Sequence, residues 1–151
     1  MDDITAAYLA GYLERGGAIR IYVNRVKDGD YLKIETVIGD TLPIESAGIY
    51  VRVRSADMTV LRDLKRMFEG KLSEGQWQGW NEDAAALLRV ILPYLRTGKR
   101  KAIVNLVLEF HAFIESRKEQ MMGSLLFFTV EDVDVIVRYE TALREMTGSK
   151  G

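Results

Sequence analysis

The chain has 151 residues, 48% of them hydrophobic and 28% charged, with 21 Lys and Arg against 22 Asp and Glu. This composition is typical of one globular domain, and it excludes a fibrous repeat or a charged tail. The absence of cysteine excludes disulfides and thiolate chemistry, and the single histidine, His111, disfavours zinc sites and Ser-His-Asp triads within one chain.

The first predicted element is a helix over residues 4–15, which the pair Gly16-Gly17 ends. Small side chains on a helix let a second backbone approach closely. This helix has four of them, at Ala6, Ala7, Ala10 and Gly11. Two explanations are open: the helix packs tightly in its own core, or it meets a copy of itself.

Strands are predicted next, over residues 18–27, 31–38 and 49–55. Asp28-Gly29 predicts a tight hairpin between the first two, with Val23 opposite Ile34. Because side chains alternate across a strand, each strand has an apolar face and a polar face. The polar face carries eight residues: Arg20, Tyr22, Asn24, Lys33, Glu35, Tyr50, Arg52 and Arg54. Four cations against one anion make this face positive.

The second half of the chain is mainly helical. The sequence predicts a helix over 58–68 capped by Asp57, a small hairpin over 71–80, and helices over 81–95, 98–117 and, after a capping pair at Thr129 and Asp132, through Met146. This order predicts an α+β fold with an antiparallel sheet and C-terminal helices. We expect a core domain over 1–117 and a helical extension of the same domain over 118–151.

Two separated motifs resemble the LAGLIDADG homing endonucleases. The first is Leu9-Ala10-Gly11-Tyr12-Leu13-Glu14-Arg15-Gly16-Gly17, and the second runs from Ala84 through Leu92-Pro93-Tyr94-Leu95 to Phe110. The resemblance covers residues 4 to about 115 and implies that family's αββαββα core. Since one signature is present, the likeness is to the members that act as homodimers. It implies a dimer interface at Ala6, Ala7, Ala10 and Gly11 and a polar sheet face that lies in the DNA major groove.

The chain departs from the family at the catalytic acid. In the family each signature helix delivers an acidic residue to metal ions at the cleaved strands, and the matching position here is Gly16. Glu14 lies about 200° away around the helix and therefore points elsewhere. The family's basic residue matches Gly98, although Lys99, Arg100 and Lys101 follow. The resemblance thus implies an inactive nuclease site with no cofactor.

Three functions follow from these patterns. The first is sequence-specific binding of double-stranded DNA by an inactive homodimer. The second is an active endonuclease that uses Mg²⁺ with Glu14, Lys99 and Lys101, and the third is a protein-interaction module that has lost DNA affinity. No apolar run is long enough to cross a bilayer, and Met1-Asp2-Asp3 is acidic where a signal peptide is basic. We therefore expect an intracellular protein with no membrane partner.

Overall fold

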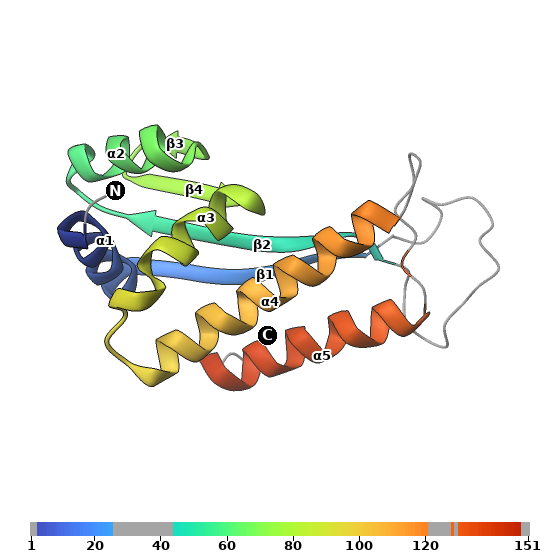
Figure 1. The fold of residues 1–151 in the computed structure, drawn as a ribbon. Coiled ribbons are helices and arrows are strands. Elements are labelled where there is room, and N and C mark those ends of the chain that lie inside the picture. Colours follow the sequence, from blue (N-terminus) through green and yellow to red (C-terminus); the bar gives the residue numbers. More distant parts are fainter. Residues whose placement is uncertain (1–2, 26–43, 121–127, 129, 149–151) are drawn as a thin grey trace.

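The computed structural model describes residues 3–25, 44–120, 128 and 130–148, which form an α+β fold (Figure 1). The elements in chain order are α1 (Asp3–Gly16), β1 (Gly17–Arg25), β2 (Ile44–Arg54), α2 (Met58–Phe68), β3 (Lys71–Ser73), β4 (Gln76–Trp80), α3 (Glu82–Ile91), the 3-10 helix η1 (Leu92–Tyr94), α4 (Gly98–Gln120) and α5 (Val130–Thr147). The predicted hairpin at Asp28-Gly29, the strand over 31–38 and the pairing of Val23 with Ile34 lie outside the described residues.

The four strands form one antiparallel sheet in the order β1-β2-β4-β3. β1 pairs with β2, with Arg20 opposite Tyr50, and β2 pairs with β4, with Arg52 opposite Gln78. The expected strand at 49–55 therefore begins earlier, at Ile44, and is the direct partner of β1. The predicted antiparallel sheet and the αββαββα order of the core are confirmed.

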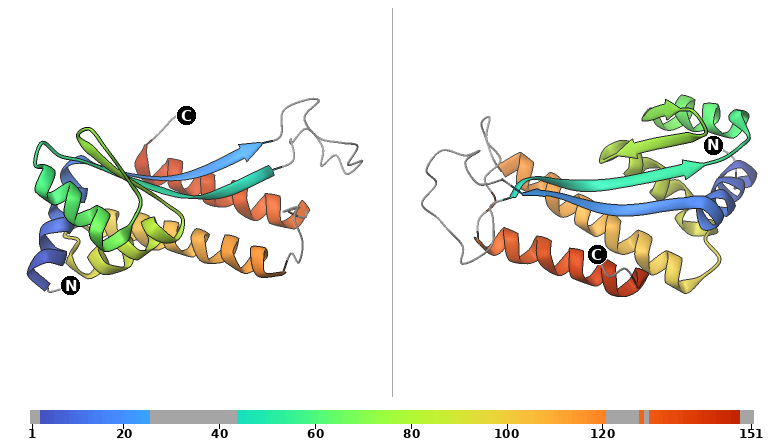
Figure 2. Two further views of the ribbon diagram at one scale, coloured as in Figure 1. Left: turned by 90° about the horizontal axis from the view of Figure 1, so that it is seen from above. Right: turned by 180° about the vertical axis from the view of Figure 1, so that it is seen from behind.

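One face of the sheet packs against the helices. Ile49 and Val51 of β2 and Trp77 of β4 are completely buried on this side, together with residues of α3 and α4. Figure 2 shows the molecule from behind, where the strands lie in front of α3 and α4. The opposite face of the sheet is thus turned away from these two helices.

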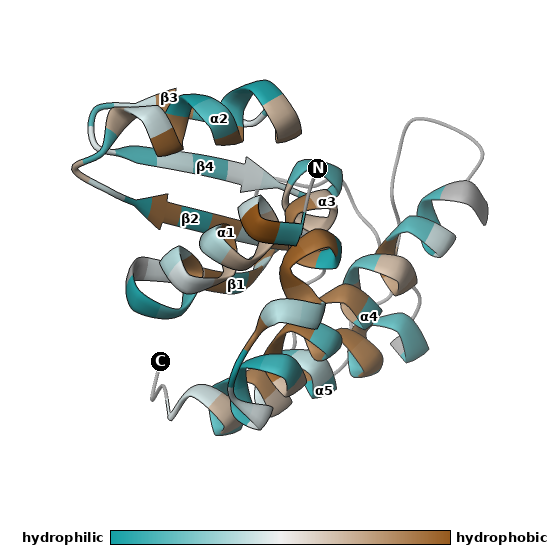
Figure 3. Cartoon of the chain, turned by 60° about the vertical axis from the view of Figure 1, so that its left-hand side comes forward, coloured by the Kyte–Doolittle hydropathy of each residue, from teal (hydrophilic) through white to brown (hydrophobic). Residues whose placement is uncertain are grey.

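α1 lies at one end of the sheet and contributes Leu9 and Leu13 to the core. Figure 3 shows hydrophobic segments of α1, α3 and α4 coming together beside the strands. β1 follows α1 without a loop, and a Cβ at Gly17 would overlap the carbonyl oxygen and side chain of Leu13. Only glycine therefore permits this tight exit from α1, which determines where the outward residues of β1 lie.

Helix ends differ from the prediction in two places. α3 stops at Ile91 and continues as η1, because Pro93 has no N–H to continue an α-helix. α4 continues past Arg117 to Gln120, since no Gly or Pro interrupts this stretch. The cap at Asp57 is confirmed, with its carboxylate accepting a 2.9 Å hydrogen bond from the Thr59 amide.

The C-terminal helix packs on α4, and an ion pair joins the two. Arg117 Nε lies 2.9 Å from Asp132 Oδ1, and the Asp132 side chain is almost completely buried. Asp132 therefore pairs across to α4, while Thr129, its predicted capping partner, lies outside the described residues. No helix in the described part of the chain is long and apolar enough to cross a membrane.

Candidate nucleic-acid interface

The face of the sheet turned away from α3 and α4 is the candidate interface, which we call the outer face. Residues directly paired across antiparallel strands point to the same side, so the strand register defines its members. They are Ala18, Arg20, Tyr22 and Asn24 of β1, Ser46, Gly48, Tyr50, Arg52 and Arg54 of β2, Gln76, Gln78 and Trp80 of β4, and Lys71 and Ser73 of β3. The structure thus brings together six of the eight residues predicted to bind DNA. Lys33 and Glu35 lie outside the described residues.

The outer face is positively charged. It carries Arg20, Arg52, Arg54 and Lys71, and none of its described members is an Asp or Glu. None of these four cations forms an ion pair within the described part of the chain. Arg25, by contrast, lies 2.7 Å from Glu140 of α5. Positive charge is therefore neutralised at the end of β1, whereas the described residues leave it uncompensated on the outer face.

Arg52 has the most constrained of these side chains. It lies on β2, an inner strand, between Ala18 and Gln78, and it is half-buried. Its Nε is buried and has no hydrogen-bond acceptor among the described residues. On the neighbouring strand, the side-chain N–H of Gln78 donates to the hydroxyl of Tyr50 at 2.7 Å. The Arg52 Nε is therefore left without a partner in the part of the chain that the structure describes.

Tyr22 is held in place by Asn81, the residue between β4 and α3. The Asn81 amide donates to the Tyr22 hydroxyl at 2.8 Å, and its oxygen accepts a 3.2 Å bond from the Ile49 backbone. These groups meet over Gly48, where a Cβ would overlap both the Asn81 and Tyr22 side chains. Asn81 adopts a positive φ of 51°, an uncommon conformation for a residue other than glycine. The hydroxyl of Tyr22 is therefore occupied by Asn81, and the aromatic ring of Tyr22 is the part that can contact a partner.

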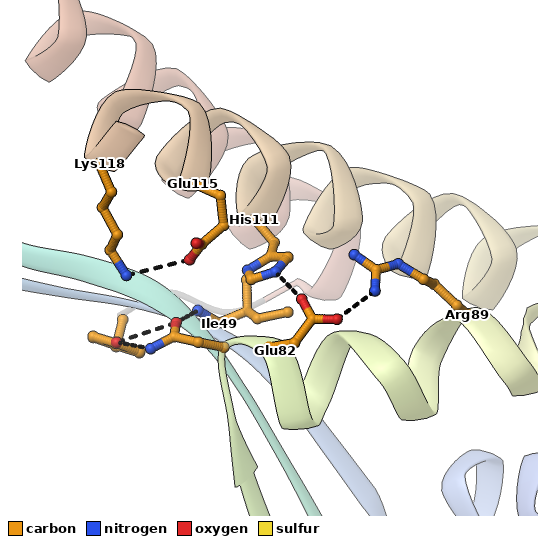
Figure 4. A network of polar contacts seen from close by, with 8 residues as sticks. Ile49, Glu82, Arg89, His111, Glu115 and Lys118 are labelled. Atoms are coloured by element: carbon orange, nitrogen blue, oxygen red, sulfur yellow. Dashed lines mark hydrogen bonds and ion pairs between the residues drawn. The ribbon is translucent and has the colours of Figure 1, made fainter. Parts of the chain in front are cut away.

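A second polar cluster lies behind the sheet. Glu82, at the start of α3, lies 2.7 Å from Arg89 and 3.0 Å from Nε2 of the buried His111 of α4 (Figure 4). Hydrogen bonds from Arg89 and then from His111 hold the pKa of Glu82 below its ordinary value. An ionised carboxylate only accepts hydrogen bonds, so Nε2 of His111 is the donor in this contact. This cluster joins α3 to α4 and supports the position of Asn81.

The C-terminal end of α1 faces a hollow of about 510 Å³. Glu14, Lys99 and Arg100 line it, whereas Lys101 does not. The Glu14 carboxylate accepts a 2.7 Å hydrogen bond from the Arg96 backbone, just before α4. Within the described residues no group of three or more His, Asp or Glu side chains could hold a metal ion. The structure therefore brings Glu14 and Lys99 to the same hollow, where one carboxylate oxygen of Glu14 is engaged by the chain itself.

The small residues of α1 fall on two sides of the helix. Ala6 and Ala10 are 3% and 1% exposed, because they face the core of their own chain. Ala7 is exposed and Gly11 is partly exposed, beside Ile4 and Tyr8, which are 83% and 53% exposed. The prediction that all four small residues form one interface is corrected accordingly: only Ala7 and Gly11 are accessible to another molecule.

Among the residues of this region that the sequence did not predict, four bear most directly on its chemistry. Lys71, Gln78 and Trp80 belong to the outer face, and Asn81 orients Tyr22. The alternation of side chains along 76–80 is a signal that could have placed Gln78 and Trp80 on the polar side. The Trp80 ring lies 5.3 Å from the Tyr50 ring between centroids, tilted by 45°, whereas Trp77, three residues earlier, is buried.

No protein-family model and no curated protein matches this sequence. Solved structures do match. The chain is 16% identical to the homing endonuclease I-CvuI in complex with its target, with a TM-score of 0.60 over 97% of this chain and 84% of that one. A double mutant of I-SmaMI matches with a TM-score of 0.61 and 12% identity, over 97% of this chain and 45% of that one. The homing endonuclease I-TnaI matches with a TM-score of 0.54 and 12% identity, over 95% and 93%. The chain thus has the fold of the LAGLIDADG homing endonucleases.

Proposed function

We propose that this chain, built on the homing-endonuclease fold, binds double-stranded DNA sequence-specifically as a homodimer and does not cleave it. The outer face is the surface that meets the duplex. The observation that carries the proposal is a sheet face whose described residues include four cations that form no ion pair in the described part of the chain, and no acid. I-CvuI, which shares the fold, is seen in complex with its target.

The chemistry of the outer face suits a DNA groove. Arg and Lys bind phosphates, and Arg donates two hydrogen bonds to the edge of guanine, whereas Asn and Gln pair with adenine. Arg20, Arg54 and Asn24 are exposed on this face. The Asn24 amide donates a 2.8 Å hydrogen bond to the Ser46 hydroxyl, which leaves its oxygen to accept from a ligand. The net charge of −1 gives no general attraction to nucleic acid, so binding relies on this local patch.

Two observations support the homodimer. This chain matches 45% of the length of the I-SmaMI chain, which leaves room in that chain for a second unit of this size. In addition, α1 exposes the apolar side chains Ile4 and Tyr8 beside the small residues Ala7 and Gly11. A second copy packed on this face of α1 would bury them and place two outer faces along one duplex.

The absence of cleavage rests on the end of α1. The position that matches the family's metal-binding acid is Gly16, the last residue of α1, and glycine has no side-chain oxygen for Mg²⁺. Glu14, the nearest carboxylate in the chain, is engaged by the Arg96 backbone. An active Mg²⁺-dependent endonuclease is the second candidate, because Glu14 and Lys99 line the same hollow. A protein-interaction module without DNA affinity is the third.

The test is to incubate the purified protein with a pool of random duplexes in Mg²⁺, and to score retention and strand cleavage separately. We expect retention that weakens steeply with salt, since each phosphate contact releases counterions, and no cleavage. Arg20→Glu with Arg54→Glu should abolish retention. Arg62→Glu, an exposed cation of α2, is the matched control and should retain the pool. Retention by the strand variant would exclude the outer face, and no retention by any protein would favour the interaction module.

A further inference from the structure

Three aromatic side chains form a line across the outer face, which we call the aromatic row. Trp80 of β4 is paired directly with Tyr50 of β2, and their ring centroids are 5.3 Å apart. Tyr22 of β1 is opposite Gly48, two residues before Tyr50, so Tyr22 is the diagonal neighbour of Tyr50. Diagonal neighbours on antiparallel strands lie about 7 to 8 Å apart. The aromatic row therefore runs without a break from β4 across β2 to β1.

The aromatic row presents rings to a ligand. Each tyrosine hydroxyl already has a partner within the chain, since that of Tyr22 is bonded to Asn81 and that of Tyr50 accepts from Gln78. The Trp80 side chain is 40% exposed. Its ring is tilted by 45° against the Tyr50 ring, so Tyr50 does not cover it as a parallel ring would. The part of the row that is left for a ligand is aromatic ring.

Cations surround the aromatic row. Arg20 is the direct partner of Tyr50 on β1, and Arg52 and Lys71 lie in the next row of paired residues. None of the three forms an ion pair, and no Asp or Glu belongs to this face, among the described residues. A ligand that matches both features combines flat ring faces with closely spaced negative charges. Nucleotide bases and their phosphates have this combination.

The faces of the bases distinguish a single strand from a duplex. In a duplex each base is stacked between its neighbours, and the grooves present base edges and phosphates. In a single strand the bases can leave the stack and lie on aromatic side chains. Exposed rings on a cationic sheet therefore match a single strand in a way that they do not match a duplex.

We propose that the outer face has a second binding activity: it binds single-stranded nucleic acid, with unpaired bases stacked on the aromatic row. The phosphates lie beside the cations Arg20, Arg52 and Lys71. This activity goes beyond the proposed function, because it requires neither a duplex nor a dimer nor a particular base. The stacking chemistry is shared by single-stranded DNA and RNA, so the experiment includes both.

Trp80 can report on the binding directly, because the other tryptophan, Trp77, is completely buried. The protein is titrated with a short oligothymidylate and with an oligouridylate, and a base that stacks on Trp80 should quench its fluorescence. Trp80→Leu should bind about 5- to 150-fold more weakly. Trp80→Phe keeps a ring and should bind nearly as well, with no quenching from Trp77. Met58→Leu, an exposed apolar position on α2, is the matched control and should bind like the unmodified protein.

A second measurement uses the unmodified protein alone, so that it does not depend on the folding of a variant. An abasic oligonucleotide of the same length keeps the phosphates but has no bases, and it should bind more weakly and leave Trp80 unquenched. Annealing the complementary strand hides the base faces and should also reduce the quenching.

Three results would overturn this inference: no binding of either oligonucleotide, equal binding of the abasic one, or unchanged binding by Trp80→Leu. The last two would show that charge alone attracts the single strand. The retention of random duplexes is scored separately and decides the proposed function. Quenching of Trp80 by a single strand, in a protein that retains no duplex, would leave this inference standing while the proposed function fails.

Discussion

The hydroxyl of Tyr22 and the side-chain amide of Asn81, 59 residues apart in the chain, form hydrogen bonds of 2.8 and 3.2 Å with each other across β2. Asn81 is also bonded to Ile49 through both its backbone N–H and its side-chain oxygen. This arrangement joins β1, β2 and the start of α3 at one point. It requires a residue without a side chain at position 48, because the side chains of Asn81 and Tyr22 meet directly over Gly48.

Replacing Gly48 with alanine should therefore destabilise the fold, because the added Cβ overlaps Asn81 and Tyr22. We expect a loss of about 1–3 kcal/mol of unfolding free energy, which is typical of overpacking. Denaturant unfolding measures it. Gly98→Ala is the control, since a Cβ at Gly98 meets no atom within 4 Å, and it should be neutral. Equal stability of the two variants would contradict the tight approach at Gly48.

The homodimer can be tested without disturbing the core. A Cβ at Gly11 of α1 meets nothing within 4 Å in its own chain. Gly11→Leu should therefore leave the monomer folded but prevent a second α1 from approaching. Light scattering across a range of concentrations should give a dimer for the unmodified protein and a monomer for this variant. A monomer for the unmodified protein at every concentration would remove the dimer from the proposal.

Acid should weaken the contact between α3 and α4. Hydrogen bonds from Arg89 and His111 lower the pKa of Glu82 below 4.5, so its stabilising effect is fully present above that pH and is lost as the pH falls through the lowered value. Because the Glu82 side chain is 66% exposed, we expect only about 0–1 kcal/mol at pH 7. Urea unfolding between pH 7 and 3 should show a flatter pH dependence for Glu82→Gln.

The matched control for Glu82→Gln is Glu74→Gln, which changes an exposed carboxylate with no ion pair in the described part of the chain. This control should follow the pH dependence of the unmodified protein. If Glu82→Gln follows it as well, the contact of Glu82 with Arg89 and His111 has no effect on stability.

Local patterns in the sequence predicted much of the fold. The alternation of side chains predicted which residues of β1 and β2 point outward, and Asp57 predicted the start of α2, because both depend on residues close together in the chain. Strand partners depend on distant residues. The register that sets Arg52 beside Gln78, and so brings Lys71 onto the same face, could not be derived from either segment alone.

The candidate site could be predicted only in part, because it too depends on contacts between residues that are far apart in the chain. Small residues in α1 indicated close packing, but the spacing could not tell which of them face the core, and Ala6 and Ala10 do. The hydrogen bond from the Arg96 backbone to Glu14 joins residues 82 positions apart. It depends on the course of the chain after η1, which local patterns do not predict. Asn81 was predicted only as the first residue of a helix, whereas its side chain bonds to Tyr22 and makes no capping bond.

The last prediction concerns cleavage, which we expect to be absent in the unmodified protein and restorable at one position. Gly16 is the last residue of α1. Gly16→Asp should produce Mg²⁺-dependent nicking of the duplex that the protein selects, since carboxylate oxygens are the ligands that Mg²⁺ prefers. Gly16→Asn, similar in shape but without the charge, should not. Cleavage is followed on supercoiled DNA that contains the selected site. Robust cleavage by the unmodified protein that Glu14→Gln abolishes would instead identify Glu14 as the catalytic acid, because glutamine keeps an oxygen for the Arg96 backbone and removes only the charge.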